Sequence, residues 1–157
     1  MEQILEKHSD MKGVIHTHTH DITDRLNSLL KTDRLLVREP GISNEDILSK
    51  HQTTNEPTIL MSPSLTYGVD LKDDLARFQI IIKLPYPSLH NKRIKMLFDK
   101  SPGWYENKML NTLVQACGRA TRSAEDWSYT YILDGNIVRV LHKCKTKLPD
   151  HYITRVV

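Results

Sequence analysis

The stretch GWYENKMLNTLVQACGRATRSAEDW, residues 103–127, predicts one long amphipathic helix that runs from about Trp104 to Arg122. At about 100° per residue, its side chains divide between two faces. The polar face comprises Lys108, Asn111, Gln115, Arg119 and Arg122, and the opposite apolar face comprises Met109, Leu110, Leu113, Val114, Cys117 and Ala120. The apolar face is expected to pack on a sheet, while periodicity alone favours a solvated surface for the polar face.

Gly118 is expected in the interior of this helix, where glycine costs roughly 1 kcal/mol relative to alanine. Because it immediately precedes Arg119, the missing side chain favours the close approach of another surface or of a phosphate chain. Arg119 and Arg122 stand about one turn apart, and two guanidinium groups are suited to bind phosphoryl oxygens bidentately. The polar face is therefore a candidate phosphate-binding surface.

Short apolar runs alternate with amphipathic segments outside this helix. Strands are expected at the start of 13–20, at 34–37, 57–61 and 78–84, and in SYTYIL and NIVRVL after the long helix, and helices at 21–31, from Ser43 to about 51, and at 92–98. Ser43 and Asp46 have the spacing of a helix N-terminal cap. This alternation predicts an α/β domain whose mostly parallel sheet is covered on both faces by helices, with the chemistry in loops at the strand ends.

Composition sets broad limits on the function. A chain of 157 residues favours one domain, and a net charge of +3 permits contact with a polyanion without requiring it. Cys117 and Cys144 are too few for a disulfide framework or a four-thiolate iron–sulfur site, which favours a reducing compartment, cytoplasmic or, in a eukaryote, nuclear. No stretch approaches the roughly 20 apolar residues of a membrane span, so no membrane partner is expected.

Four segments resemble the motifs of the XPD/DinG-type superfamily 2 DNA helicases. QACGRATRS (115–123) is similar to the last helicase motif, QxxGRxxR, and SLTYGVDL (64–71) is similar to the motif SxxEGxD. IIIKLPYPS (80–88) resembles the strand and loop that follow, and KGVIHTHTHDITDRL (12–26) resembles the motif IV strand and helix. The segments come in the family's order from about 12 to 134, with motif IV at about 13–20, motif V at about 62–71 and motif VI at about 115–123.

The resemblance implies that residues 1–157 form a single C-terminal, second RecA-like motor domain. Its fold would have three layers, a mostly parallel central sheet with helices on both faces, like a P-loop NTPase without its own P-loop. No GxxxxGK[ST] loop and no Asp-Glu-x-His sequence occurs, so the chain alone is expected not to hydrolyse ATP. ATP and Mg²⁺ would be held mainly by a first RecA-like domain, present in cis or in trans.

The resemblance also implies roles for individual residues. Arg122 would be the arginine finger, Arg119 its partner, and Gln115 would lie near the phosphates or the attacking water. Gly68, Asp70 and Gly118 would bind nucleotide or couple its state to the grip on DNA, although Gly68 and Asp70 also suit an ordinary turn. Thr19, His18, His20 and Ser64 would contact single-stranded DNA.

Some residues leave other functions open. Tyr67 stands where the family has Glu, which leaves room for a catalytically silent RecA-like module that binds nucleic acid or protein. His16, His18 and His20 alternate, and in a strand they would share one face and could present ligands to Zn²⁺. Because no fourth ligand is evident and the segment coincides with motif IV, we expect no metal site there. Tyr86, Trp104, Tyr105 and Trp127 could stack on bases, but packing is the simpler expectation.

Overall fold

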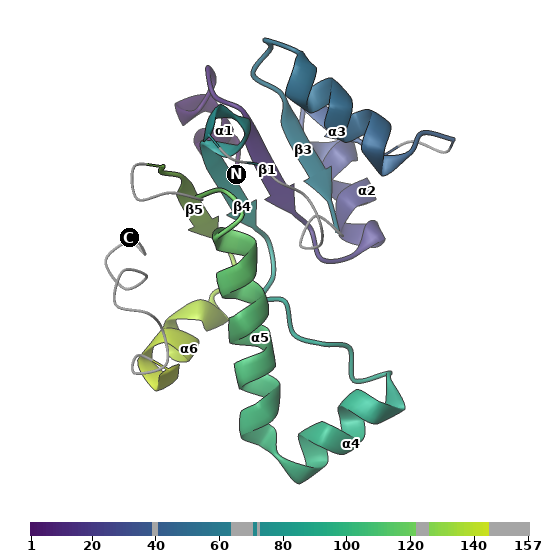
Figure 1. Cartoon of the computed structure of the whole chain (residues 1–157), viewed down its shortest axis with the longest axis vertical. Helices are drawn as coiled ribbons and strands as arrows, with labels where there is room; N and C mark the ends of the chain where they lie inside the picture. Colours follow the sequence, from purple (N-terminus) through teal and green to yellow (C-terminus); the bar gives the residue numbers. More distant parts are fainter. Residues whose placement is uncertain (39–40, 64–70, 72, 122–125, 145–157) are drawn as a thin grey trace.

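The computed structural model describes residues 1–38, 41–63, 71, 73–121 and 126–144 (Figure 1). Five strands in these ranges form one sheet, in the order β2-β3-β1-β4-β5. The strands are β1 (Gly13–His16), β2 (Leu35–Val37), β3 (Ile59–Ser62), β4 (Phe78–Ile81) and β5 (Tyr129–Ile132). Every pairing between neighbours is parallel, which confirms the predicted parallel sheet.

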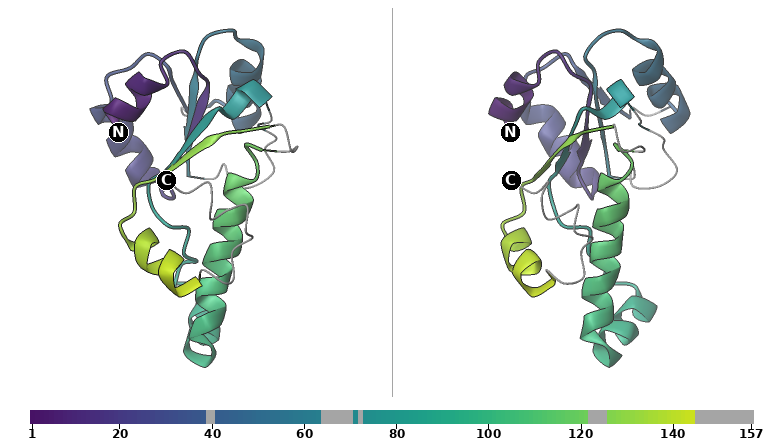
Figure 2. Two further views of the ribbon diagram at one scale, coloured as in Figure 1. Left: turned by 90° about the vertical axis from the view of Figure 1, so that its left-hand side faces the viewer. Right: turned by 60° about the vertical axis from the view of Figure 1, so that its left-hand side comes forward.

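Helices cover both faces of this sheet, as Figure 2 shows. They are α1 (Glu2–Lys7), α2 (His20–Leu29), α3 (Asn44–Thr53), α4 (Lys92–Lys100), α5 (Pro102–Cys117) and α6 (Asn136–Cys144), with a short 3₁₀ helix η1 (Asp73–Ala76). On one face, α1 and α2 pack through Leu5 and Leu26 against alternate strand residues such as Ile15 and Ile59. On the other face, α3 packs against the strand residues that point the opposite way, including Val14 and Leu60. The predicted three-layer architecture, a parallel central sheet with helices on both faces, is therefore confirmed.

The end of α5 and helix α6 form a third apolar cluster beside the end of β4. Leu113 of α5 and Val140 of α6 are buried here with Leu84, which follows β4. This packing fixes the orientation of α5, whose first half extends away from the sheet toward α4 (Figure 1). In the described part of the chain, every helix is too short or too polar to cross a bilayer.

The helical state of residues 136–144 corrects the sequence prediction, which made NIVRVL a strand. Ile137 and Val140 are buried three positions apart, whereas Val138 between them is 60% exposed, so the apolar pattern is helical. Asp134 begins the helix by accepting a hydrogen bond from the Asn136 amide at 3.0 Å. Periodicity alone does not distinguish a short strand from a helix in an apolar segment of this length. Helix α1 was not predicted.

Gly13 allows β1 to lie against β4 in the centre of the sheet. It pairs with Phe78, and a Cβ atom on Gly13 would lie 2.3 Å from the Phe78 ring. That ring is fully buried and stacks on His8 with the two ring centroids 4.9 Å apart. The ring therefore has little freedom to move aside, and glycine is required by the close approach.

We predict that Gly13→Ala destabilises the domain by about 1–3 kcal/mol, because the added methyl group overpacks this contact. Chemical denaturation of the purified domain measures the change. Gly103→Ala, within α5, is the matched control, since nothing lies within 4 Å of its added Cβ. Equal unfolding midpoints for wild type and Gly13→Ala would show that the ring accommodates the methyl group.

Candidate functional site

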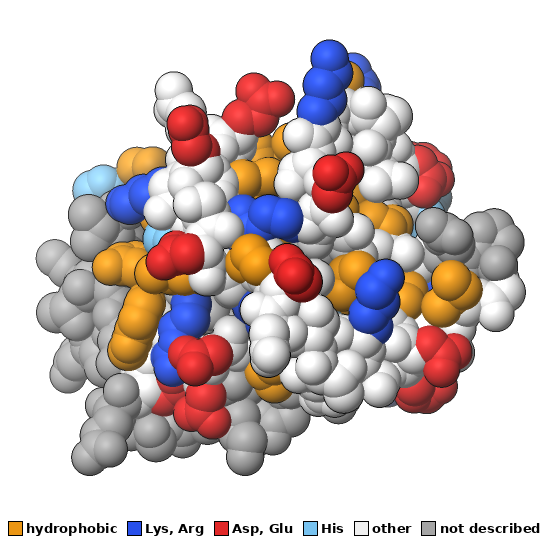
Figure 3. Space-filling model, turned by 90° about the horizontal axis from the view of Figure 1, so that it is seen from above, with side chains coloured by type: hydrophobic (Ala, Val, Ile, Leu, Met, Phe, Trp, Pro, Cys, Tyr) orange, Lys and Arg blue, Asp and Glu red, His pale blue; other side chains and the backbone are white. Residues whose placement is uncertain are grey.

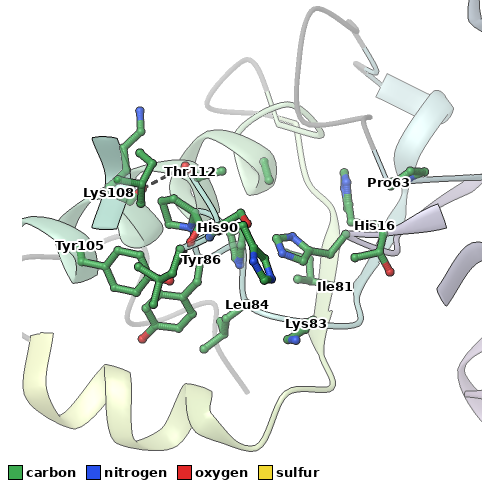
Figure 4. Close-up of a pocket in the computed structure, with 18 residues that line it drawn as sticks. His16, Pro63, Ile81, Lys83, Leu84, Tyr86, His90, Tyr105, Lys108 and Thr112 are labelled. Atoms are coloured by element: carbon green, nitrogen blue, oxygen red, sulfur yellow. Dashed lines mark hydrogen bonds between the residues drawn. The ribbon is translucent and has the colours of Figure 1, made fainter. Parts of the chain in front are cut away.

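A cavity of about 890 Å³ lies at the carboxyl-terminal edge of the parallel sheet (Figure 4). Its lining comes from the ends of three strands and from the two helices that follow: His16, His18, Thr19, Pro63, Ile81, Lys83, Leu84, Pro85, Tyr86, Pro87, Ser88, Leu89, His90, Ile94, Tyr105, Lys108, Thr112 and Ala116. In open parallel α/β sheets, ligands bind outside the carboxyl ends of the strands. The cavity is therefore the first candidate for a binding site.

Aromatic packing holds the wall formed by the loop after β4. The rings of Tyr86 and Tyr105 stack with their centroids 5.1 Å apart, and the Tyr105 hydroxyl donates a hydrogen bond to the Pro87 carbonyl at 2.7 Å. Asp134 accepts a further bond from the Leu84 amide at 3.0 Å. These contacts join the loop to α5 and to the end of β5. The two tyrosines pack against each other, which was the simpler expectation for them.

Apart from the phenols of Tyr86 and Tyr105, the ionisable side chains that line the cavity are basic. Lys83 and Lys108 supply positive charge, and His16, His18 and His90 supply imidazoles, while no carboxylate occurs among the lining residues that the structure describes. On the face seen in Figure 3, by contrast, acidic and basic side chains are interspersed. A cavity lined by charge of one sign favours an anionic ligand, including the phosphates of a nucleic acid.

Burial keeps two of these imidazoles neutral. Desolvation lowers the pKa of His16 to about 4, and its hydrogen bond to Gln79 opposes the shift only in part. Burial, together with the nearby charge of Lys83, also lowers the pKa of His18. The lowered pKa values mean that His16 and His18 add little positive charge to the cavity near neutral pH.

The segment after β1 departs from the strand that its alternating histidines suggested. The strand ends at His16, His18 takes a positive φ of 73°, and His20 is the first residue of α2. Thr19 is the exposed N-terminal cap of that helix, and its hydroxyl oxygen accepts a bond from the Ile22 amide at 3.3 Å. The three imidazoles therefore do not share a strand face, which the alternative of a zinc site required. Within the described residues, no three His, Cys, Asp or Glu side chains gather as metal ligands.

The motif VI segment also differs from the predicted continuous helix. Helix α5 ends at Cys117 instead of Arg122, and Gly118 is its C-terminal cap with φ −69° and ψ −8°. After the Gly118 amide bonds to Val114, the amides of Arg119 and Ala120 each donate to a carbonyl three residues earlier, at 3.3 Å. The chain thus leaves the helix through a tight turn. Gly118 was expected in the helix interior and Arg119 on the polar face of the helix, and both predictions are wrong because the helix ends before these residues.

The candidate nucleotide and DNA residues are thus only partly visible. Gln115 is exposed in the last turn of α5, and Arg119 is partly exposed in the turn that follows. Arg122, Gly68, Asp70 and Ser64 lie outside the described residues, as does Tyr67. The structure therefore gathers His18 and Thr19 at the cavity, while His20 follows them at the exposed start of α2.

Comparison with protein families decides which domain this is. A family model described as the helicase C-terminal domain matches residues 3–152. The chain belongs to this family. The resemblance to XPD/DinG-type helicases, drawn from the motifs, is confirmed.

Relatives of this helicase C-terminal domain are much longer proteins. ATP-dependent DNA helicase CHL1 of Candida albicans is 28% identical over 132 residues, which cover 67% of this chain and 16% of that protein. The CHL-1 helicase of Caenorhabditis elegans is 30% identical over 108 residues, covering 62% of this chain and 13% of the relative. The chain therefore spans less than a fifth of the length of these curated relatives.

Solved structures share the fold. A structure of XPD without ligands matches 95% of this chain and 34% of its own with a TM-score of 0.69 at 21% identity. The C-terminal domain of the DEAD-box protein Dbp5 matches 95% of this chain and 78% of its own with a TM-score of 0.59 at 13% identity.

A partly buried ion pair joins the segments that flank motifs V and VI of the helicase domain. Asp126 is 6% exposed, and its carboxylate accepts a bond from the Arg77 guanidinium at 2.8 Å. The same guanidinium bonds to Asp74 of η1 and lies 4.8 Å from the ring centroid of Trp127. The Asp73 amide also donates to Asp126, at 3.4 Å. Arg77 thus ties the chain after motif VI to the chain after motif V.

Sequence reasoning missed three polar residues of this region: Arg77, Gln79 and Lys83. Arg77 and Lys83 flank the apolar run of β4 and carried no periodic signal. Gln79 did carry a signal in the sequence, because an amide inside the apolar run FQIIIKL is unusual for a strand buried on both faces. Such a residue in a central strand indicates a buried hydrogen-bond partner.

We predict that the domain loses stability as the pH falls from about 6.5 to 4. The unfolded chain binds a proton at His16 near pH 6.5, but the folded domain binds it only near 4, so the contribution of the neutral ring is complete above 6.5. The shift corresponds to about 3 kcal/mol at the acidic limit. Denaturation midpoints of wild type and His16→Leu across this range should converge on acidification. A constant difference would contradict the assignment, and the exposed His142→Asn is the control.

Proposed function

We propose that this chain is the second motor domain of an ATP-dependent DNA helicase. It would supply arginines to ATP held mainly by a first RecA-like domain, and it would contact single-stranded DNA at the carboxyl edge of its own sheet. The observation that carries the proposal is the cavity at that edge, whose lining includes lysine and histidine side chains but no carboxylate among the described residues. The motif IV segment and the loop after β4 contribute much of its wall. Family membership and the ordered motifs support it.

The nucleotide side of the proposal rests on motif VI. Transfer of a γ-phosphoryl group needs positive charge positioned where negative charge develops. Arg122 would be the arginine finger, Arg119 its partner, and Gln115 would orient the phosphates or the attacking water. Gly118, Gly68 and Asp70 would bind nucleotide or couple its state to DNA. Mg²⁺ and most of the ATP contacts would belong to the first domain, so this chain alone would not hydrolyse ATP.

The DNA side rests on the cavity and on the start of α2. Lys83 and Lys108 would attract phosphates of a single strand, and Thr19, His18, His20 and Ser64 would lie along the same path. The exposed amide end of α2 adds partial positive charge beside Thr19. The CHL1 relatives are named as DNA helicases, which supports DNA as the polyanion.

The proposal predicts that separate substitutions impair ATP hydrolysis and DNA binding in the complete helicase, that is, in this chain together with its first motor domain. Arg122→Ala and Arg119→Ala should each lower kcat for ATP hydrolysis by roughly 10³-fold or more, with little change in the Kd for single-stranded DNA. Lysine at either position should not restore the rate, since it lacks the planar bidentate fork. Lys83→Ala should instead weaken DNA binding and reduce the slope of log K against log salt by about 0.7.

Steady-state ATPase assays and fluorescence anisotropy with an oligonucleotide measure the two effects. Arg139→Ala, on the exposed surface of α6, and Lys50→Ala, on α3, are the matched controls and should change neither quantity. Wild-type ATPase in Arg122→Ala would contradict the finger assignment. DNA binding without any ATPase in the wild-type complete protein would favour the silent binding module that Tyr67 leaves open.

A further inference from the structure

Gln79 is a buried amide at the centre of the sheet. It is 2% exposed and lies in β4 between β1 and β5, among apolar neighbours. Its Nε2 donates to the Cys117 carbonyl at 3.2 Å and to the Thr130 hydroxyl at 2.9 Å. Its Oε1 lies 3.3 Å from Nε2 of His16. One side chain thus contacts both neighbouring strands and the helix packed above them.

The orientation of this amide follows from its partners. A carbonyl oxygen can only accept, so the Gln79 atom that faces Cys117 must be the amide nitrogen. The oxygen therefore faces His16, and the neutral imidazole must donate to it from Nε2. This leaves Nδ1 of His16 as an acceptor, which is buried and has no hydrogen-bond partner among the residues that the structure describes. His16 is 7% exposed and lines the cavity, as Figure 4 shows.

The hydrogen-bond chain from His16 through Gln79 ends at the Cys117 carbonyl. Cys117 begins the turn of residues 117–120, which contains Arg119 and is called the arginine turn below. Cys117 is the last residue of α5, and carbonyls in the last turn of a helix lack partners within the helix. Its oxygen accepts from the Ala120 amide at 3.3 Å as well as from Gln79. Gly118 and Arg119 lie within the turn that these bonds close. Gln79 therefore helps to fix the point at which the backbone leaves the helix toward Arg119.

We propose that Gln79 is a positioning residue that, through His16, couples occupancy of the cavity to the placement of the arginine turn. This inference rests on the proposed function in one respect, which is that DNA is the ligand that enters the cavity. A ligand that contacts or displaces the His16 ring alters its bond to Oε1. Because the amide is one rigid plane, a change at Oε1 also alters the bond from Nε2 to Cys117. Buried hydrogen bonds of this kind polarise one another, which favours transmission.

The test uses the complete helicase and compares Gln79→Met with Thr130→Val. Methionine fills a similar volume without the hydrogen bonds, whereas Thr130→Val removes only the third partner and leaves His16–Gln79–Cys117 intact. Two quantities are measured: the stimulation of ATPase by single-stranded DNA, and DNA-dependent amide hydrogen exchange in a peptide covering residues 113–121. Thermal denaturation confirms that each variant is folded.

We expect Gln79→Met to reduce DNA stimulation about 10-fold while the Kd for DNA changes less than about 2-fold. The DNA-dependent change in exchange at 113–121 should be present in wild type and in Thr130→Val and lost in Gln79→Met. Unchanged stimulation in folded Gln79→Met would overturn the proposal, and so would an equal loss in Thr130→Val, which would indicate general damage to the sheet.

The two proposals fail in different ways. If wild-type protein hydrolyses no ATP, but DNA still changes exchange at 113–121 in wild type and not in Gln79→Met, the motor function fails and the coupling stands. If the wild-type ATPase is active but DNA leaves exchange at 113–121 unchanged, the coupling fails and the motor function stands.

Discussion

β1 and β4 lie side by side in parallel, with Gly13 opposite Phe78 and His16 opposite Ile81, and the candidate site depends on this pairing. Because both strands end at the same edge, the segment after His16 and the loop after Ile81 converge there and form most of the cavity wall. The pairing also places Gln79 within reach of His16, so the cavity and the interior of the sheet share one hydrogen-bond chain.

Helix α5 relates the cavity to the arginine turn. Tyr105, Lys108, Thr112 and Ala116, which follow one another at helical spacing, contribute one wall of the cavity. The same helix ends one residue after Ala116, and Arg119 follows in the turn. This helix borders the cavity proposed for DNA along its length and carries the proposed phosphate-binding residues at its end. Such an arrangement would suit the proposed motor function, in which DNA contact and ATP hydrolysis must respond to each other. The ion pair of Arg77 and Asp126 holds the segment after that turn against η1.

The parallel sheet was predictable because four of its strands are compact apolar runs separated by segments with helical spacing, as at residues 57–61 and 78–84. The failures occurred where tertiary contacts override local pattern. At the end of α5, the Cys117 carbonyl accepts a bond from Gln79, which is 38 residues away in sequence and which no local pattern could predict. The positive φ of His18 breaks an alternation that resembled a strand, and the cluster beside β4 makes NIVRVL a helix. Motif order identified the domain, but the place of Lys83 at the cavity and the partners of Gln79 became visible only when the strands were assembled.

The central claim is that this domain completes an ATPase site whose other half belongs to a first RecA-like domain. The most direct measurement is a structure of the complete helicase trapped with Mg²⁺, ADP, aluminium fluoride and single-stranded DNA. The account predicts guanidinium groups of Arg119 and Arg122 within hydrogen-bond distance of the fluoride that mimics the γ-phosphoryl group, and the strand lying at the cavity beside Lys83. Guanidinium groups turned away from an occupied nucleotide site, with the strand bound elsewhere, would contradict it.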